Sequence, residues 1–152
     1  MTAPIKDIKA LRSKALNDLE VTYPVPRWVE KAGVEVFVTY IPADDPTVEK
    51  IIDIAAKREK GKEKVAIKTG DLQVQVDTCK TVTFVFSDGD KKVYDGFSDS
   101  DLATDLGVES PSARNTADAL FLTDGDLSAL SRKVLEWSGY NSDEINEAFL
   151  GE

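Results

Sequence analysis

The clearest pattern of apolar and polar positions lies at the C-terminal end, where two helices are predicted with both ends marked. Thr123 is the N-cap of the first helix, and Asp124 and Asp126 in its first turn complement the exposed amide groups. Gly139 suits the left-handed residue that ends this helix, and Ser142 opens the second one. The two apolar faces comprise Leu127, Leu130, Val134 and Trp137 and then Ile145, Ala148, Phe149 and Leu150. Such a helix pair has to pack on another surface.

The N-terminal segment also has helical periodicity. Its lysines, Arg12 and Asp18 lie away from a single apolar face. We expect a helix over residues 4–20 that packs on its own domain, with docking on a neighbouring subunit as the alternative. The apolar face comprises Ile5, Ile8, Leu11, Ala15 and Leu19.

Residues 21–41 alternate as a strand does. Pro24 and Pro26 exclude a central strand at the start, so we predict a β-hairpin whose first arm lies at a sheet edge, with residues 31–33 as the reversal. Trp28 is expected to anchor the sheet to a helix, and an exposed binding aromatic is the alternative. The alternating positions are Val34, Val36, Val38 and Tyr40 against Glu35, Phe37 and Thr39.

A helix is predicted to start at Asp45, as its N-cap, with Pro46 at the first helical position. It leads into a basic segment, residues 57–68, which we interpret as a solvated and flexible loop. Contact with nucleic acid is the alternative, but Glu59 and Glu63 dilute the positive charge and no aromatic residue is interleaved. The buried face of the helix is expected to comprise Val48, Ile51, Ile52, Ile54 and Ala55.

Residues 70–81 fit both a strand and a helix. Leu72, Val74 and Val76 alternate, whereas Leu72, Val76, Cys79 and Thr83 have helical spacing. We favour a helix that gives way to a strand over residues 82–86, and the assignment of 70–81 stays open. A turn at residues 87–90 then leads into a second hairpin arm, residues 92–94.

Two further helices are predicted, one capped by Ser98 and ending at Gly107, and one started by Ser110 and Pro111. The chain therefore predicts an α+β fold, with a small β-hairpin sheet, packed helices and a mainly helical C-terminal half. We treat residues 1–152 as a single domain. Its parts are an N-terminal helix (4–20), a mixed α/β part (21–97) and a helical C-terminal part (98–152).

The residue types restrict the chemistry. The chain has 152 residues, no histidine and one cysteine, Cys79, so the commonest general base, the commonest zinc ligand and an internal disulfide are missing. Cys79 stands in an apolar context and is expected to be a buried thiol. The aspartates of residues 88–101 do not fit an EF-hand loop, because Val93 and Asp99 occupy the positions of its glycine and glutamate. We expect no catalytic, cofactor-binding or metal-binding residues, and a protein that is not an enzyme.

Charge is spread unevenly along the chain. Residues 1–70 carry 13 basic and 11 acidic side chains, a net of +2, whereas residues 71–152 carry 6 and 17, a net of −11. Acidic surfaces repel phosphate backbones, so we expect no nucleic-acid partner. A solvated acidic surface explains the imbalance, and an acidic face matched to a basic partner is the alternative. Apolar runs fall short of the ~20 residues that span a bilayer, and the N-terminus lacks a signal-peptide core. We therefore expect an intracellular protein with no membrane partner.

Residues 119–152, ALFLTDGDLSALSRKVLEWSGYNSDEINEAFLGE, resemble the C-terminal segment of tail assembly chaperones from long-tailed phages and prophages of actinobacteria. The resemblance rests on the TDGD motif at 123–126, the WSGY motif at 137–140 and the closing Gly151-Glu152. The order of predicted elements upstream is also similar.

This resemblance implies a non-enzymatic chaperone in the cytoplasm of the infected bacterial host. Such chaperones bind the tape measure protein, keep it soluble during tail assembly, help to recruit tail tube protein and are absent from the virion. The resemblance further implies self-association. In this family a programmed frameshift often yields a longer form, and this chain would correspond to the short form.

For partner binding we propose Trp137, Tyr140 and Phe149 on the terminal helices, with a place in the core as the alternative for each. The main rival function is a virion structural protein, either a head-tail connector or a tail subunit. An enzyme is a third class, which a deep polar pocket with perturbed carboxylates would favour.

Overall fold

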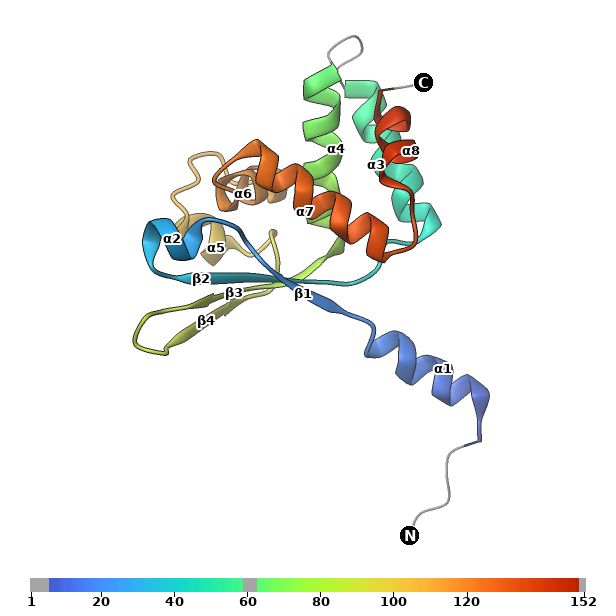
Figure 1. Ribbon diagram of the computed structural model, residues 1–152, viewed down its shortest axis with the longest axis horizontal. Coiled ribbons are helices and arrows are strands. Elements are labelled where there is room, and N and C mark those ends of the chain that lie inside the picture. The colour runs from blue at the N-terminus through green and yellow to red at the C-terminus, as the bar shows by residue number, and fades with distance from the viewer. Residues whose placement is uncertain (1–5, 59–62, 151–152) are drawn as a thin grey trace.

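The computed structural model of the chain describes residues 6–58 and 63–150, and Figure 1 shows their arrangement. The fold is α+β, with strands in the first two thirds and a helical C-terminal half, as predicted. In chain order the elements are α1 (Ile8–Asn17), β1 (Val21–Pro24), α2 (Trp28–Ala32), β2 (Glu35–Tyr40), α3 (Asp45–Arg58), α4 (Glu63–Thr78), β3 (Cys79–Val85), β4 (Lys91–Tyr94), α5 (Ser100–Asp105), α6 (Ala113–Leu120), α7 (Asp124–Trp137) and α8 (Ser142–Phe149).

The described strands form one antiparallel sheet in the order β1-β2-β3-β4. Its inner face carries Val36 and Val38 of β2 beside Phe84 and Val82 of β3, and the helices pack on this face. Strand β1 lies at the edge and pairs with β2, as predicted, and β3 and β4 form the predicted second hairpin. The turn of that hairpin contains Gly89 at φ +92°, a conformation that favours glycine.

The connection between β1 and β2 differs from the predicted simple reversal at residues 31–33. Pairing with β2 continues through Pro24, opposite Phe37, and the Val25 amide still donates to the carbonyl oxygen of Val36. Pro26, which lacks an amide hydrogen, follows directly. The chain then forms the short helix α2 before Gly33, at φ +71°, turns it into β2.

Trp28 on α2 ties the sheet to the helical layer, as predicted. Its ring meets Phe84 of β3 edge to face, with the ring centres 5.6 Å apart. Its indole nitrogen donates a hydrogen bond of 2.8 Å to the carbonyl oxygen of Leu120, at the end of α6. The apolar ring is therefore packed while its one polar group is paired.

The predicted N-cap of α3 was wrong by one residue. Asp44, not Asp45, accepts a hydrogen bond from the amide of Thr47 at 2.9 Å, which makes Asp45 the first helical residue. Pro46 fits the second position equally well, since the first four amides of a helix have no partner within it. The hydrogen bonds from Thr47 lower the pKa of Asp44. On the predicted buried face, Val48, Ile51 and Ala55 are buried and Ile52 and Ile54 are partly exposed.

The basic segment 57–68 is not a single loop. Helix α3 continues to Arg58 and α4 begins at Glu63, so residues 57–58 and 63–68 are helical, whereas residues 59–62 lie outside the described residues. The segment 70–81 is helical through Thr78, and strand β3 starts at Cys79, three residues before the predicted start.

Helix α4 buries a different face from the one that its apolar residues suggest. Leu72 and Val76 are only partly buried. The buried positions are Ala66, Gly70, Asp71, Gln73, Val74, Gln75 and Thr78. Packing on several sides covers both apolar and polar positions of this helix, and the polar ones remain buried because most of their groups find hydrogen-bond partners.

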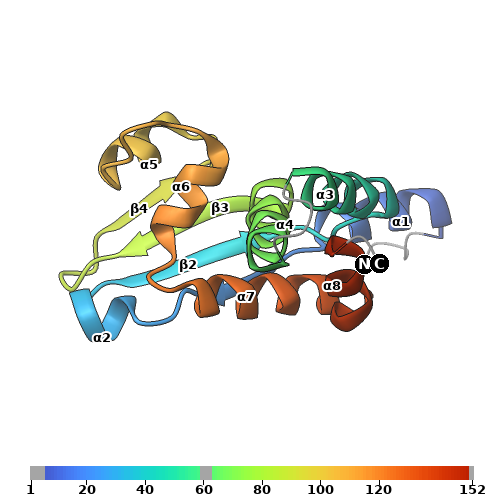
Figure 2. The same ribbon diagram turned by 90° about the horizontal axis from the view of Figure 1, so that it is seen from above.

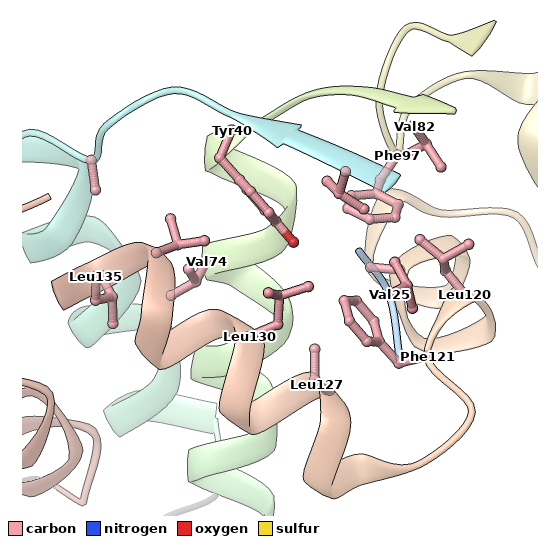
Figure 3. Packing of buried hydrophobic residues seen from close by; sticks show 14 of the residues in the cluster. Val25, Tyr40, Val74, Val82, Phe97, Leu120, Phe121, Leu127, Leu130 and Leu135 are labelled. Atoms are coloured by element: carbon pink, nitrogen blue, oxygen red, sulfur yellow. The ribbon is translucent and has the colours of Figure 1, made fainter. Parts of the chain in front are cut away.

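Three buried polar side chains link the sheet to α4 and α7. The Tyr40 hydroxyl donates to Gln75 Oε1 at 2.5 Å, Gln75 Nε2 donates to Ser131 Oγ at 2.9 Å, and Ser131 Oγ donates to the carbonyl oxygen of Asp71 at 3.1 Å. The three side chains are fully buried. In Figure 3 Tyr40 reaches from β2 into the space between Val74 of α4 and Leu130 of α7. Burial raises the pKa of Tyr40 further above its ordinary value, so its hydroxyl remains a donor.

The two short helices of the C-terminal half begin one or two residues later than predicted. Asp99 rather than Ser98 caps α5, because its carboxylate accepts from the amides of Asp95 and Asp101. Ser112 rather than Ser110 caps α6 by accepting from the amide of Asn115. For α7 the predicted Thr123 cap and the left-handed Gly139 are confirmed, while Asn141 caps α8 ahead of Ser142.

Helix α1 lies apart from the other elements, which shows that the expected packing on its own domain was wrong. Figures 1 and 2 show it extending beyond the end of β1, and every residue from 6 to 20 is exposed. Ile8 is 80% exposed, and Leu11, Leu16 and Leu19 are 42%, 50% and 45% exposed. Helical periodicity identifies the apolar face of a helix but not the surface that covers it.

Among the described helices, none is both long enough and apolar enough to cross a membrane.

Substituting Gly70→Ala tests a close contact between α4 and α8. A Cβ atom at Gly70 would lie 2.6 Å from Cδ2 of Phe149. Alanine normally stabilises a helix by about 1 kcal/mol over glycine, but this overlap is expected to cost about 1–3 kcal/mol. We therefore expect Gly70→Ala to lower the free energy of unfolding, measured by urea denaturation.

The matched background is Phe149→Leu, in which the ring is absent. There Gly70→Ala should raise the free energy of unfolding relative to Phe149→Leu alone. The same sign of effect in both backgrounds would show that the ring contact does not explain this glycine.

Candidate functional site

A groove of about 460 Å³ opens between the first half of α4 and the start of α7. Val65 and Leu72 of α4 and Leu127 of α7 give it a largely apolar lining. Residues 65, 68, 69 and 72 follow the three- and four-residue spacing of one helical face, as do 124, 127 and 128 on α7, so two helical faces form the two walls. The remaining lining residues are Ile67, Lys68, Thr69, Asp71, Asp124 and Ser128.

Lys68 spans the rim of the groove. Its Nζ lies 3.2 Å from Oδ1 of Asp118 on α6 and 3.2 Å from Oδ1 of Asp124 at the start of α7. Partial burial disfavours the charged amine, but the hydrogen bonds to Asp124 and Asp118 outweigh it and raise the pKa of Lys68. Arg27 forms a second ion pair at the start of α7, with its Nε 2.8 Å from Oδ2 of Asp126. The ion pairs of Lys68 therefore connect α4 to α6 and α7, and the ion pair of Arg27 connects the residue before α2 to the start of α7.

Asp71 is the unusual residue of this groove. It is 2% exposed, yet its Oδ1 has no hydrogen-bond partner within the described part of the chain. Burial raises the pKa of Asp71 to about 7, although the charge of Arg132 and a hydrogen bond with Ser128 oppose the shift. A buried acceptor without a partner is costly, which makes this oxygen a candidate for contact with a bound group.

The groove has the features of a binding site for an apolar side chain accompanied by a hydrogen-bond donor or a cation. The apolar walls suit an apolar side chain, and Asp71 Oδ1 suits a hydrogen-bond donor or a cation. A carboxyl group with a pKa of about 7 is also a mark of acid-base catalysis. An enzyme would be favoured by a deep polar pocket, however, and here a single buried carboxyl group lies among mostly apolar walls.

A second hollow, of about 440 Å³, lies beside the sheet edge and is lined in part by Trp28, Phe84 and Tyr94. Its charged groups are already paired. Lys92 Nζ lies 2.6 Å from Oδ2 of Asp105, and the Tyr94 hydroxyl donates to the same oxygen. These bonds lower the pKa of Asp105. The α4–α7 groove is the stronger candidate because it contains the unpaired Asp71 oxygen.

The three proposed partner-binding residues lie at the α3–α8 end of the molecule. Phe149 is 1% exposed and packs in the core, whereas Trp137 and Tyr140 are partly buried against it. The Tyr140 hydroxyl donates to Asp45 Oδ1 of α3, and this hydrogen bond, followed by burial, raises the pKa of Tyr140 to about 12. Of the three residues, Phe149 fits the alternative of a place in the core best. The role of all three in partner binding stays a prediction.

The other residues singled out in the sequence have structural roles. Cys79, predicted to be a buried thiol, is only partly buried, and burial still raises the pKa of its thiol to about 12. Asp88 accepts from the amide of Asp90 in the β3–β4 turn, and Asp99 caps α5. Within the described residues, no group of three or more acidic or cysteine side chains could hold a metal ion.

Sequence reasoning missed the groove because its key residue is a buried aspartate inside a helix. The only signal was helical spacing, since Asp71 lies three residues before Val74 and four before Gln75 and so shares a face with them. The apolar positions of this segment, however, fit both a helix and a strand. Periodicity treats every carboxylate as exposed, so it places Asp71 on the solvent side.

The chain matches no protein-family model, no curated protein and no solved structure.

Substituting Asp71→Asn should change how stability depends on pH. The pKa of Asp71 is about 7 in the folded protein against an ordinary value of 3.8, so the folded state binds more protons between these values. The free energy of unfolding of the wild type therefore falls as pH rises through this window. Asparagine does not titrate, so its advantage over aspartate should be larger at pH 8 than at pH 5.5 by roughly 1–2 kcal/mol.

Urea denaturation of both proteins at the two pH values checks this. All other titrating groups are shared, so their contributions cancel in the difference. An equal effect of Asp71→Asn at both pH values would mean that the carboxyl group is ionised in the folded protein at both.

Proposed function

We propose that this chain is a tail assembly chaperone of a long-tailed phage, which holds the tape measure protein soluble by binding an apolar segment of it in the α4–α7 groove. The resemblance of residues 119–152 to such chaperones supplies the functional class. The observation that carries the binding mode is the groove itself, with apolar walls and a buried carboxylate oxygen that has no partner within the described residues.

The surroundings of the groove favour a client with basic side chains. Residues 71–152 carry a net charge of −11, and at the rim of the groove Asp118 and Asp124 share one cation, Lys68. A positively charged helix of the client would be attracted to this region by its charge. Its apolar side chains would then lie inside the groove, where they cannot associate with other proteins. Tail tube protein is a second expected partner in this proposal.

Two exposed surfaces favour the rival function, a virion structural protein such as a connector or tail subunit. Helix α1 is exposed along its whole length, and the outer face of the sheet, which carries Phe37, Thr39 and Val93, points away from the helices. Subunits of a particle use such surfaces to contact their neighbours. The two functions are separated by whether the protein remains in finished particles.

Co-expression with the tape measure protein of the same phage tests the proposal. We expect the tape measure protein to move into the soluble fraction, to be recovered in a pull-down with this chain, and this chain to be missing from purified particles. Stoichiometric presence in particles would instead identify a structural subunit.

The substitution Val65→Lys places a charge on the apolar wall of the groove. Val65 is 41% exposed, so the fold should tolerate the change, whereas recovery of the tape measure protein should fall by roughly tenfold or more. Val29→Lys is the matched control, since Val29 is 56% exposed on α2 and does not line the groove. Equal recovery with both variants would exclude this groove as the client site.

A further inference from the structure

Helix α1 has an exposed apolar stripe that includes a cation. Ile8, Leu11 and Ala15 follow helical spacing, and Arg12 projects between Ile8 and Leu16 on the same side. Lys9 and Lys14 lie elsewhere around the helix, which has three basic residues and no acidic one. Covering this stripe with an apolar surface alone would bury the Arg12 charge without a partner. A surface that fits α1 must therefore offer apolar contacts and a carboxylate together.

The α4–α7 groove offers this combination. Its apolar walls match the stripe, and Asp71 supplies a buried carboxylate oxygen that has no partner in the described residues. A guanidinium beside it would favour the ionised carboxylate and satisfy its free acceptor.

We propose that α1 of one copy of this chain docks in the α4–α7 groove of a second copy, with Arg12 directed at Asp71. Two features that are costly apart, an exposed apolar helix with an embedded cation and a groove with one carboxylate oxygen that has no hydrogen-bond partner in the described residues, satisfy each other in this arrangement. An exchange of α1 in both directions doubles the buried area, which brings two short helices closer to the roughly 800 Å² per partner of a stable interface.

The position of α1 favours a second copy over the same chain as the source of the helix. Only residues 18–20 join α1 to β1, and Glu20 is held at the sheet by an ion pair of 2.6 Å with Lys80. In both ribbon views α1 lies beyond β1 at the end of the molecule where α3 and α8 lie, whereas α7 begins at the opposite end. Three extended residues reach at most about 10 Å, so a connection this short holds α1 near the sheet edge of its own chain.

The docked helix would also occupy the groove proposed for the client. Self-association and client binding then compete, so the free chaperone keeps its apolar groove covered until a client helix displaces α1. This consequence rests on the proposed function, whereas the docking itself does not.

The full-length protein, without any client, provides the test. Sedimentation velocity over a concentration series should show a reversible self-association of the wild type. Arg12→Glu should weaken it by roughly tenfold or more. Lys14→Glu is the matched control, because it makes the same charge change on the opposite side of the same exposed helix, and it should have a clearly smaller effect. A monomeric wild type at all concentrations, or equal effects of the two variants, would overturn the proposal.

Disulfide trapping identifies the surface. In a Cys79→Ser background, chains carrying Leu11→Cys are mixed with chains carrying Val65→Cys, or with chains carrying Val29→Cys as the control. We expect a covalent pair between Leu11→Cys and Val65→Cys chains and little with the control, because disulfides form only between closely apposed residues.

Two outcomes would overturn the assignment of the surface. One is equal trapping with the control. The other is a chain carrying both Leu11→Cys and Val65→Cys that closes on itself as a monomer. The tape measure protein is absent from the sedimentation and trapping experiments. Their failure therefore does not affect the co-expression experiment, and failure of the co-expression experiment does not affect them.

Discussion

The structure depends on a buried hydrogen-bond chain that runs from Tyr40 through Gln75 to Ser131. These three side chains come from β2, α4 and α7 and meet among buried apolar residues. A buried polar group tolerates little displacement, because each lost hydrogen bond costs about 1–3 kcal/mol, whereas apolar contacts slide at lower cost. The chain therefore fixes how α4 and α7 sit against the sheet and, with them, the two walls of the groove.

Helix α4 combines this structural role with the candidate site. One side of it closes against Phe149 of α8 through Gly70, another carries the Gln75 contact, and a third contributes Val65 and Leu72 to the groove. Asp71 takes part in both the hydrogen-bonded contact with α7 and the groove. Its carbonyl oxygen accepts a hydrogen bond from Ser131, and its carboxyl group lines the groove. The backbone of Asp71 is thus bonded to α7, and its carboxyl group lines the groove.

Local signals predicted the elements whose ends are marked by their own residues. Helix α7 is the best example, since Thr123, its apolar face and Gly139 all lie within the segment that they define. Prediction failed where the deciding contact is distant in sequence. The burial of Asp71 depends on α7, and the isolation of α1 depends on what the rest of the chain leaves uncovered. Neighbouring residues with equal capping ability, such as Asp44 and Asp45, account for the small errors in helix starts.

In the proposed binding mode, the raised pKa of Asp71 links proton binding to the binding of a charged ligand. At neutral pH a carboxyl group with a pKa of about 7 is divided between its two forms. A cation that pairs with it selects the ionised form and so displaces protons near neutral pH. The apparent affinity for a positively charged segment then rises as the solution becomes more alkaline, while a neutral apolar segment is bound without this dependence. In the proposed binding mode, the groove would distinguish charged from uncharged ligands through pH as well as through shape.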